Sequence, residues 1–112
     1  MAIRWEKFTV KSQEAVQSAS QLASEHGNPE VLPLHLLAAL LGDREGIIAP
    51  VLEKIGVPVA PLGAKVEESL GKLPKVSGGA QPGASAALNR VFEQAFKEAD
   101  NFKDEYVSTE HL

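Results

Sequence analysis

The sequence predicts an all-α fold. In five successive segments, apolar residues recur at spacings of three and four positions, the period of a helix with one buried face. Glycine and proline stops separate these segments, and both residues interrupt helices. Few segments alternate apolar and polar residues, and β-branched residues seldom cluster. We therefore expect helices throughout and no sheet.

Composition limits the chain to one modest domain. It has 112 residues, 44% of them hydrophobic and 23% charged, and no apolar run approaches the length of a membrane span. The net charge of -4 and the scattered basic residues give no electrostatic basis for nucleic-acid binding. There are no cysteines, and "MAIRWEKF" lacks the apolar region of a secretory signal. We expect a soluble, cytoplasmic domain that binds neither nucleic acid nor membranes.

The first two helices have clear signals at their ends. An amphipathic segment runs from Thr9 to His26, and Gly27 follows where a left-handed residue would end the helix. Asn28-Pro29 then prevents its continuation. The second helix should begin at Pro33, because proline suits the first helical position. Its body, "LHLLAALLG", is apolar nearly all round, which predicts burial on most sides.

Three further helices complete the prediction. The third carries an apolar stripe and stops at Gly56, and the fourth runs from about Val59 to Leu70. The proline- and glycine-rich stretch "KLPKVSGGAQPGAS" should be an exposed connector, and the last long helix covers Ser85 to about Phe102. The residues expected to face inward are Ile47, Ile48, Val51, Leu52 and Ile55 in the third helix and Leu62, Val66 and Leu70 in the fourth.

The aromatic residues divide between core and surface. We expect Trp5 and Phe8 to anchor the N-terminal segment to the core, and Phe92 to be buried because of its spacing from the alanines that follow it. The other three aromatics of this region cannot all share that face, so at least one should line a groove. They are Phe96, Phe102 and Tyr106.

The two ends of the chain indicate an internal repeat. His35-Leu36 matches His111-Leu112 at an offset of 111 − 35 = 76. Any two amphipathic helices share part of such a pattern, but the common "V-x-x-x-H-L" after a matched helix and turn favours duplication. The closing "YVSTEHL" then reads as the start of a helix with Ser108 and Thr109 as caps. The same offset pairs Val16 with Phe92, Ala19 with Ala95, Ala23 with Ala99, Asn28 with Asp104, and Val31 with Val107.

No motif for catalysis or nucleotide binding is recognised. The only Gly-Lys pair, Gly71-Lys72, is followed by leucine and lacks the upstream glycine of a Walker A loop. The acidic pairs Glu67-Glu68 and Asp104-Glu105 are sequence neighbours, whose side chains point apart on a helix. We therefore expect this segment to contain no catalytic residue and to bind no cofactor by itself.

The three histidines do not have the spacing of a metal site. His26, His35 and His111 never stand four apart on one helix, so no metal is expected. If the repeat is real, the last two are third residues of equivalent helices. There an imidazole can bond the free end of its helix or pack under the preceding turn.

Four stretches, in this order, resemble the N-terminal domain of Clp ATPases: "RWEKFTVKSQEAVQSA", "VLPLHLLAALL", "KLPKVSG" and "KDEYVSTEHL". The connector "LPKVSG" is most similar to that of the ClpB-type AAA+ disaggregase chaperones, and the resemblance covers essentially the whole chain. It implies one Clp N-terminal domain over 1–112, made of two helical repeats related by a pseudo-two-fold axis. Repeat 1 would span about 8–71, a linker 72–84, and a truncated repeat 2 would span 85–112.

The resemblance also implies a function. The chain would be the substrate-recognition domain of an ATP-dependent protein disaggregase, binding exposed apolar segments of unfolded or aggregated client proteins and delivering them to a homohexameric motor. ATP and Mg would belong to two AAA+ ATPase modules of the parent chain, which are not in this segment. An adaptor-docking N-domain of a protease-associated Clp ATPase is the alternative within the family. A stand-alone helical interaction protein is the alternative outside it, and an enzyme comes third.

Three residues are candidates for substrate binding. Locally, Thr9 is a helix N-cap, Asp104 a turn residue and Glu110 a first-turn acid favoured by the helix dipole. In the Clp family, the matching positions belong to a surface linked to substrate handling. The two roles are compatible, and we expect the three residues to lie near one another, with the two acids forming an acidic rim beside a shallow groove between the repeats.

Family members continue after "STEHL" with a buried, leucine-rich helix. The 112-residue chain is therefore expected to leave the inner faces of Phe92, Ala95 and Ala99 partly uncovered. Either another chain would cover them or the natural polypeptide continues, and we favour continuation.

Overall fold

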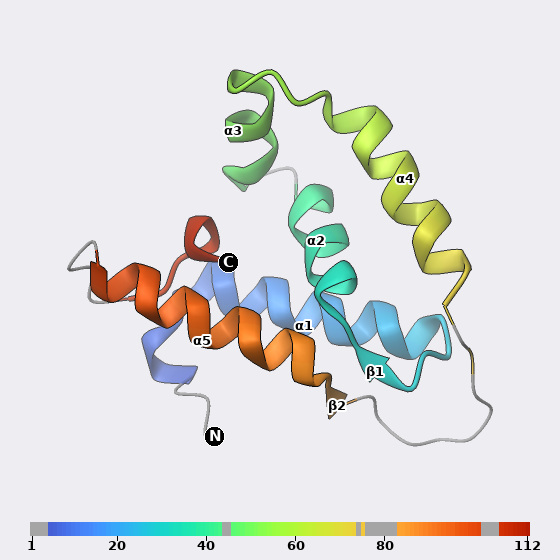
Figure 1. The fold of residues 1–112 in the computed structure, drawn as a ribbon, viewed down its shortest axis with the longest axis horizontal. Helices are drawn as coiled ribbons and strands as arrows, with labels where there is room; N and C mark the ends of the chain where they lie inside the picture. Colours follow the sequence, from blue (N-terminus) through green and yellow to red (C-terminus); the bar gives the residue numbers. More distant parts are fainter. Residues whose placement is uncertain (1–4, 44–45, 74, 76–82, 102–105) are drawn as a thin grey trace.

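The computed structural model describes residues 5–43, 46–73, 75, 83–101 and 106–112, which form a mainly helical fold (Figure 1). The predicted all-α class is confirmed. The helices are α1 (Val10–Glu25), α2 (Pro33–Gly42), α3 (Ile48–Lys54), α4 (Val59–Gly71) and α5 (Ala86–Asn101). The short elements are the 3-10 turns η1 (Trp5–Lys7) and η2 (Thr109–His111) and the strands β1 (Glu30–Val31) and β2 (Gly83–Ala84).

Helix ends follow the local chemistry that the sequence indicates. Thr9 is the N-cap of α1, where its hydroxyl oxygen accepts a hydrogen bond from the Ser12 N–H at 3.2 Å. Pro33 is the first residue of α2, as predicted. Gly27 and Gly56 follow α1 and α3 with φ of 69° and 90°, conformations in which a side chain would be strained.

The expectation that the fold contains no sheet was wrong in detail. β1 pairs with β2 in parallel, with Glu30 opposite Gly83 and Val31 opposite Ala84. An isolated parallel bridge joins Phe8 to Val107. Runs of two residues are too short to show a period of two, and their partners lie far away in the sequence, so no local pattern reveals them.

A hydrophobic cluster joins α1, α2 and α5. Phe8 is a buried member of this cluster. Its ring lies 5.6 Å from that of Phe92 in an edge-to-face arrangement and is stacked on that of Phe96 at 5.4 Å between centroids. The expectations for Phe8 and Phe92 are therefore confirmed, whereas Phe102 and the side chain of Trp5 lie outside the described residues. The helical members of the cluster are Ala15, Val16, Ala19, Ala23, Leu36, Leu40, Leu88, Phe92, Ala95 and Ala99.

The inner face of α5 is covered, contrary to expectation. Phe92, Ala95 and Ala99 are 2%, 0% and 3% exposed. Phe8, from the segment before α1, and Val107, from the segment after α5, belong to the same cluster and supply part of this cover. The segments before α1 and after α5 thus help to cover the inner face of α5, a role that the sequence interpretation assigned to a further helix.

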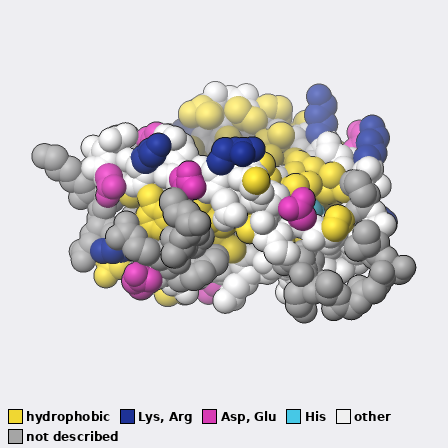
Figure 2. All heavy atoms as spheres, turned by 60° about the horizontal axis from the view of Figure 1, so that its bottom comes forward, with side chains coloured by type: hydrophobic (Ala, Val, Ile, Leu, Met, Phe, Trp, Pro, Cys, Tyr) yellow, Lys and Arg dark blue, Asp and Glu magenta, His cyan; other side chains and the backbone are white. Residues whose placement is uncertain are grey.

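The apolar stripe lies uncovered on α3 instead. Ile47, Val51 and Ile55 are 48%, 47% and 68% exposed, so their predicted inward orientation was wrong. Ile48 and Leu52 are partly buried, and Ile48 packs against the core, so the prediction holds in part for these two. In Figure 1, α3 and α4 stand at the end of the molecule away from α1 and α5, and Figure 2 shows apolar side chains gathered at this more distant end. The molecule is flat, with extents of 43 × 35 × 20 Å. A third layer that would bury α3 is absent from the described part of the chain.

The helices on either side of α3 are buried only in part. On α4, Val66 and Leu70 are buried as predicted, whereas Leu62 is only partly buried. On α2, only His35, Leu36 and Leu40 are buried, and the remaining leucines and alanines are partly exposed. The prediction of burial on most sides of α2 therefore holds in part, because every residue of this helix except Gly42 is buried or partly buried.

Equivalent backbone hydrogen bonds recur 76 positions apart. The Thr9 N–H donates to the Val107 carbonyl at 3.0 Å, and the Ser85 N–H donates to the Val31 carbonyl at 2.9 Å. The two donor residues are 76 positions apart, since 85 − 9 = 76, and so are the two acceptor residues, since 107 − 31 = 76. Each segment before a long helix therefore pairs with the other half of the chain. This exchange supports the proposed duplication, while the repeat boundaries at 71, 84 and 85 stay a prediction.

The two equivalent histidines also make equivalent bonds. Nδ1 of His35 accepts a hydrogen bond from the Leu32 N–H at 2.9 Å, and Nδ1 of His111 accepts one from the Ser108 N–H at 3.0 Å. Each ring bonds the amide just before its helical turn, as the sequence interpretation allowed.

Candidate functional site

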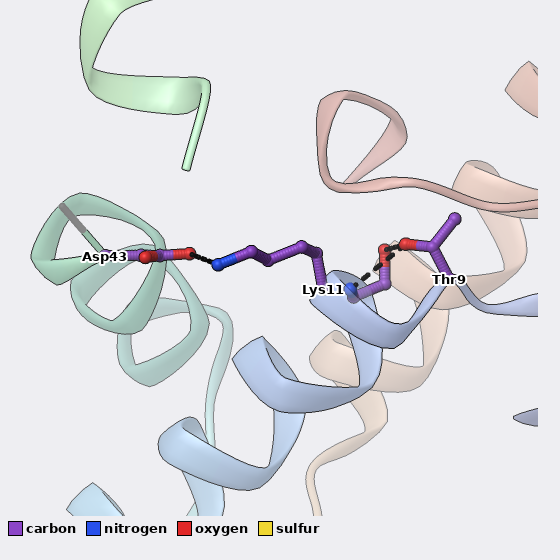
Figure 3. A network of polar contacts seen from close by, with 4 residues as sticks. Thr9, Lys11 and Asp43 are labelled. Atoms are coloured by element: carbon purple, nitrogen blue, oxygen red, sulfur yellow. Dashed lines mark hydrogen bonds and ion pairs between the residues drawn. The ribbon is translucent and has the colours of Figure 1, made fainter. Parts of the chain in front are cut away.

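The start of α1 is fixed to the C-terminal segment by a set of hydrogen bonds. The Val107 carbonyl accepts from the Thr9 N–H at 3.0 Å and from the buried Ser12 hydroxyl at 2.9 Å. The Val107 N–H donates in turn to the Lys7 carbonyl at 2.6 Å. Thr9 is half-buried, and Figure 3 shows it at the first turn of α1. These bonds hold Thr9 and the segment leading to Glu110 together. The Ser12 bond was not predicted from the sequence.

Of the three predicted site residues, Thr9 and Glu110 are described and Asp104 lies outside the described residues. Glu110 is exposed and belongs to η2, which packs against both α1 and α5. The carboxylate therefore stands on a turn that contacts the helix capped by Thr9. Their joint role in binding stays a prediction.

The charge of Glu110 is stabilised locally. A hydrogen bond from the Ser108 side chain lowers the pKa of the Glu110 carboxyl below its usual value. Partial burial acts in the opposite direction, whereas the Glu110 backbone N–H and the neighbouring His111 also lower this pKa. Glu110 consequently remains an anion at neutral pH and in mild acid.

Replacing Ser108 by alanine should raise the pKa of Glu110 toward its ordinary value, because the largest cause of the shift is removed. A carboxyl-carbon NMR titration of both proteins would measure the change. The matched control is Ser69→Ala, an exposed serine on α4. An unchanged pKa of Glu110 in the Ser108 variant would contradict the assigned cause.

Two large apolar side chains are exposed beside these polar residues. Val10, which follows Thr9, is 70% exposed, and Tyr106, which precedes Val107, is 49% exposed. Tyr106 is one of the three aromatics from which at least one groove residue was expected. The exposure of Val10 was not predicted, because no pattern in the sequence indicates whether the first residue of a helix is exposed. Phe96 is half-buried against Phe8.

A shallow hollow continues along the same face of α1. It has a volume of about 370 Å³ and is lined by Gln13, Val16, Gln17 and Ser20. Positions 9, 13, 16 and 20 recur at helical spacing, so Thr9 stands at the end of this face. Its lining is mainly polar, with two glutamines, one serine and one valine, which suits weak contacts with an extended chain.

Two observations bear on other kinds of site. Within the described ranges, no group of three or more histidine and acidic residues could hold a metal ion. The helices traced there are also too short or too polar to span a bilayer.

The fold defines a small, mainly helical domain, and comparison with known sequences gives its family. The chain matches the model for the Clp repeat (R) N-terminal domain over residues 7–112. It belongs to this family. It is 45% identical over 112 residues to the chaperone protein ClpB of Rhodopirellula baltica, covering 100% of this chain and 13% of that protein. It is 44% identical over 105 residues to ClpB of Mycobacterium bovis, covering 93% and 12%.

Solved structures have the same fold. The N-terminal domain of Hsp104 from Candida albicans superposes with a TM-score of 0.84 at 24% identity, covering 94% of this chain and 69% of that one. The N-domain of ClpV from Vibrio cholerae gives 0.80 at 20% identity, covering 91% and 61%. A ClpV N-domain in complex with a VipB peptide gives 0.74 at 21% identity, covering 91% and 62%. The chain is therefore homologous to the N-domain of ClpB chaperones, and it spans only about an eighth of their length.

Proposed function

We propose that this domain recognises client proteins for an ATP-dependent disaggregase. It would bind exposed apolar segments of unfolded or aggregated proteins and pass them to the motor of its parent chain, a hexamer in which separate modules use ATP and Mg. The observation that carries the proposal is the junction at Val107. It joins the capped start of α1 to the turn bearing Glu110, with exposed apolar side chains on both segments.

The binding mode follows from the composition of this surface. A client segment would lie along the face of α1 that begins at Thr9, with apolar side chains against Val10 and Tyr106. Glu110, ionised at neutral pH, would favour clients with a lysine or arginine near the apolar segment. Asp104 would add to this acidic rim.

One domain should bind such clients weakly. A hollow of about 370 Å³ cannot bury the surface of a standard protein interface. Several copies tethered to one hexamer would compensate, since each further contact becomes intramolecular and gains from a high effective concentration.

The double variant Thr9→Ser with Glu110→Gln tests the surface without removing the helix cap, because serine also caps helices well. We expect binding of a permanently unfolded probe, reduced and alkylated α-lactalbumin, to weaken about threefold to tenfold. Fluorescence anisotropy would measure the affinity, and circular dichroism would confirm that the helices remain.

The control for this experiment is Glu53→Gln with Ser69→Ala, which changes an exposed acid and an exposed hydroxyl on α3 and α4. It should bind the probe like the parent. Equal affinity of the parent and the Thr9/Glu110 variant would show that the client surface lies elsewhere.

Docking of a dedicated partner peptide is the second candidate. It is favoured by the solved ClpV N-domain that holds a VipB peptide, a protein of the same fold. Pulldowns from a lysate with and without denatured client would separate the two: a single folded partner enriched at fixed stoichiometry indicates docking, and many unfolded proteins indicate client capture.

A further inference from the structure

A second hollow lies on a different face of the molecule, between α1, α2 and α4. It has a volume of about 450 Å³. α2 packs against both other helices, and in Figure 1 α4 stands away from α1 with α2 between them. Because α4 lies away from α1 (Figure 1), the space between these two helices over α2 is not filled. Its lining residues are Glu14, Ala15, Ser18, Leu22, Ala38, Ala39, Gly42, Asp43 and Glu67.

The floor of this hollow is apolar and made of small side chains. Ala15 from α1 and Ala38 and Ala39 from α2 leave space that larger residues would fill, and Leu22 adds one larger apolar side chain to the lining. Gly42 adds to the opening, since a Cβ built there meets nothing within 4 Å. The volume falls in the range of about 300–1,000 Å³ that is typical of ligand pockets.

The rim carries one carboxylate from each helix: Glu14 on α1, Asp43 at the end of α2 and Glu67 on α4. One of them already holds an ammonium group, because Lys11 Nζ lies 3.4 Å from Asp43 Oδ2 (Figure 3). Both side chains of this pair are partly exposed, at 45% and 34%, so the interaction is weak and exchangeable. The rim is therefore suited to cations.

We infer that this hollow is a docking site for a basic amphipathic segment of a partner protein. Its lysine or arginine stems would lie on the alanine floor and their charged ends would reach Glu14 and Glu67, with Asp43 shared with Lys11. Long basic side chains match this arrangement, because their methylene stems are apolar and only their ends are charged. The net charge of -4 would favour the approach of such a partner.

This site is distinct from the proposed client surface. Its residues on α1 are Glu14, Ala15, Ser18 and Leu22, whereas the hollow that continues from Thr9 is lined by other α1 residues. A basic segment could thus be held while the client surface remains open.

The test uses a fluorescein-labelled amphipathic helical peptide of lysine, leucine and alanine, titrated into the 112-residue chain. Gly42→Leu should fill the hollow without a clash, and we expect it to weaken binding about fivefold to tenfold. The matched control is Gly71→Leu, since both glycines end a helix and a Cβ added at either one meets nothing within 4 Å. Gly71→Leu should bind like the parent.

Two further variants keep the inference falsifiable. Glu67 is exposed, so Glu67→Lys should not disturb the fold. This variant should bind the lysine peptide more weakly and should bind a peptide in which glutamate replaces each lysine more tightly. Glu53→Lys, the same charge change at an exposed residue of α3 that does not line the hollow, should leave the affinity for the lysine peptide unchanged. NMR shifts confined to Ala38, Ala39 and Gly42 would support the site. Equal binding by Gly42→Leu, or shifts spread over the whole acidic surface, would overturn it.

Discussion

Replacing Phe92 by alanine should lower the free energy of unfolding by about 3–5 kcal/mol, the range for truncating a buried phenylalanine. Phe92 is 2% exposed on α5, and its ring meets the edge of Phe8 at 5.6 Å between centroids. The variant loses the burial of the ring, leaves a cavity and removes an aromatic contact. Urea unfolding followed by circular dichroism would measure the loss. Such a loss would be a large part of the total free energy of unfolding of a domain of this size.

Tyr106→Ala is the control, because this aromatic side chain is 49% exposed. Its removal should change the free energy of unfolding by less than about 1 kcal/mol. If both variants lost the same small amount, Phe92 would not occupy the centre of a packed core.

His35→Ala should have the second large effect. The ring is 0% exposed, and Nδ1 accepts a hydrogen bond from the Leu32 N–H, so the proton lies on Nε2 and is donated to Asn28 Oδ1 at 2.8 Å. Alanine would leave two groups without these bonds, at about 1–3 kcal/mol for each buried polar group. Asn28 is itself buried, so water cannot readily replace the ring. We expect a loss of about 3–5 kcal/mol in urea unfolding.

The equivalent imidazole provides the control. His111 accepts the same kind of bond, from the Ser108 N–H, but it is half-buried and water can take its place. His111→Ala should therefore cost less than His35→Ala. Equal losses would contradict the importance of burial at His35.

His35 also makes stability depend on pH. Burial, and to a smaller extent the nearby His26, lowers the pKa of His35 below its usual value of about 6.5. The unfolded chain therefore binds a proton at a higher pH than the folded chain does. The contribution is complete above pH 6.5 and is lost as the pH falls from there toward the folded-state pKa. His35→Gln should flatten this part of the stability curve, measured by urea unfolding at several pH values.

Local chemistry determined the helices of this protein and the equivalent positions of its two histidine-bearing turns. Threonine before α1, proline at the start of α2 and the left-handed Gly27 and Gly56 act within one turn of their own positions, so the sequence predicts those ends closely. The repeat at an offset of 76 likewise predicted that His35 and His111 occupy equivalent positions. Its family resemblance follows from such short motifs and is confirmed over residues 7–112.

The site could be predicted only in part. Thr9 was identified as a cap, and its link to Val107 depends on a bond between segments at opposite ends of the chain. No helical period reports such a bond, and the same holds for the two-residue strands and for Ser12.

Tertiary structure alone decided which apolar faces are covered. The stripes of α3 and α5 both have helical spacing, yet Phe92 is buried and Ile55 is 68% exposed. A helical hydrophobic period predicts which face of a helix would be stabilised by burial. Burial also requires another segment of complementary shape that packs against that face. For α5 that partner is the segment around Phe8, which the parallel bridge to Val107 holds in place. The same long-range placement of α4 away from α1 leaves the alanine-floored hollow open, because its walls come from three helices whose separation no single helix encodes.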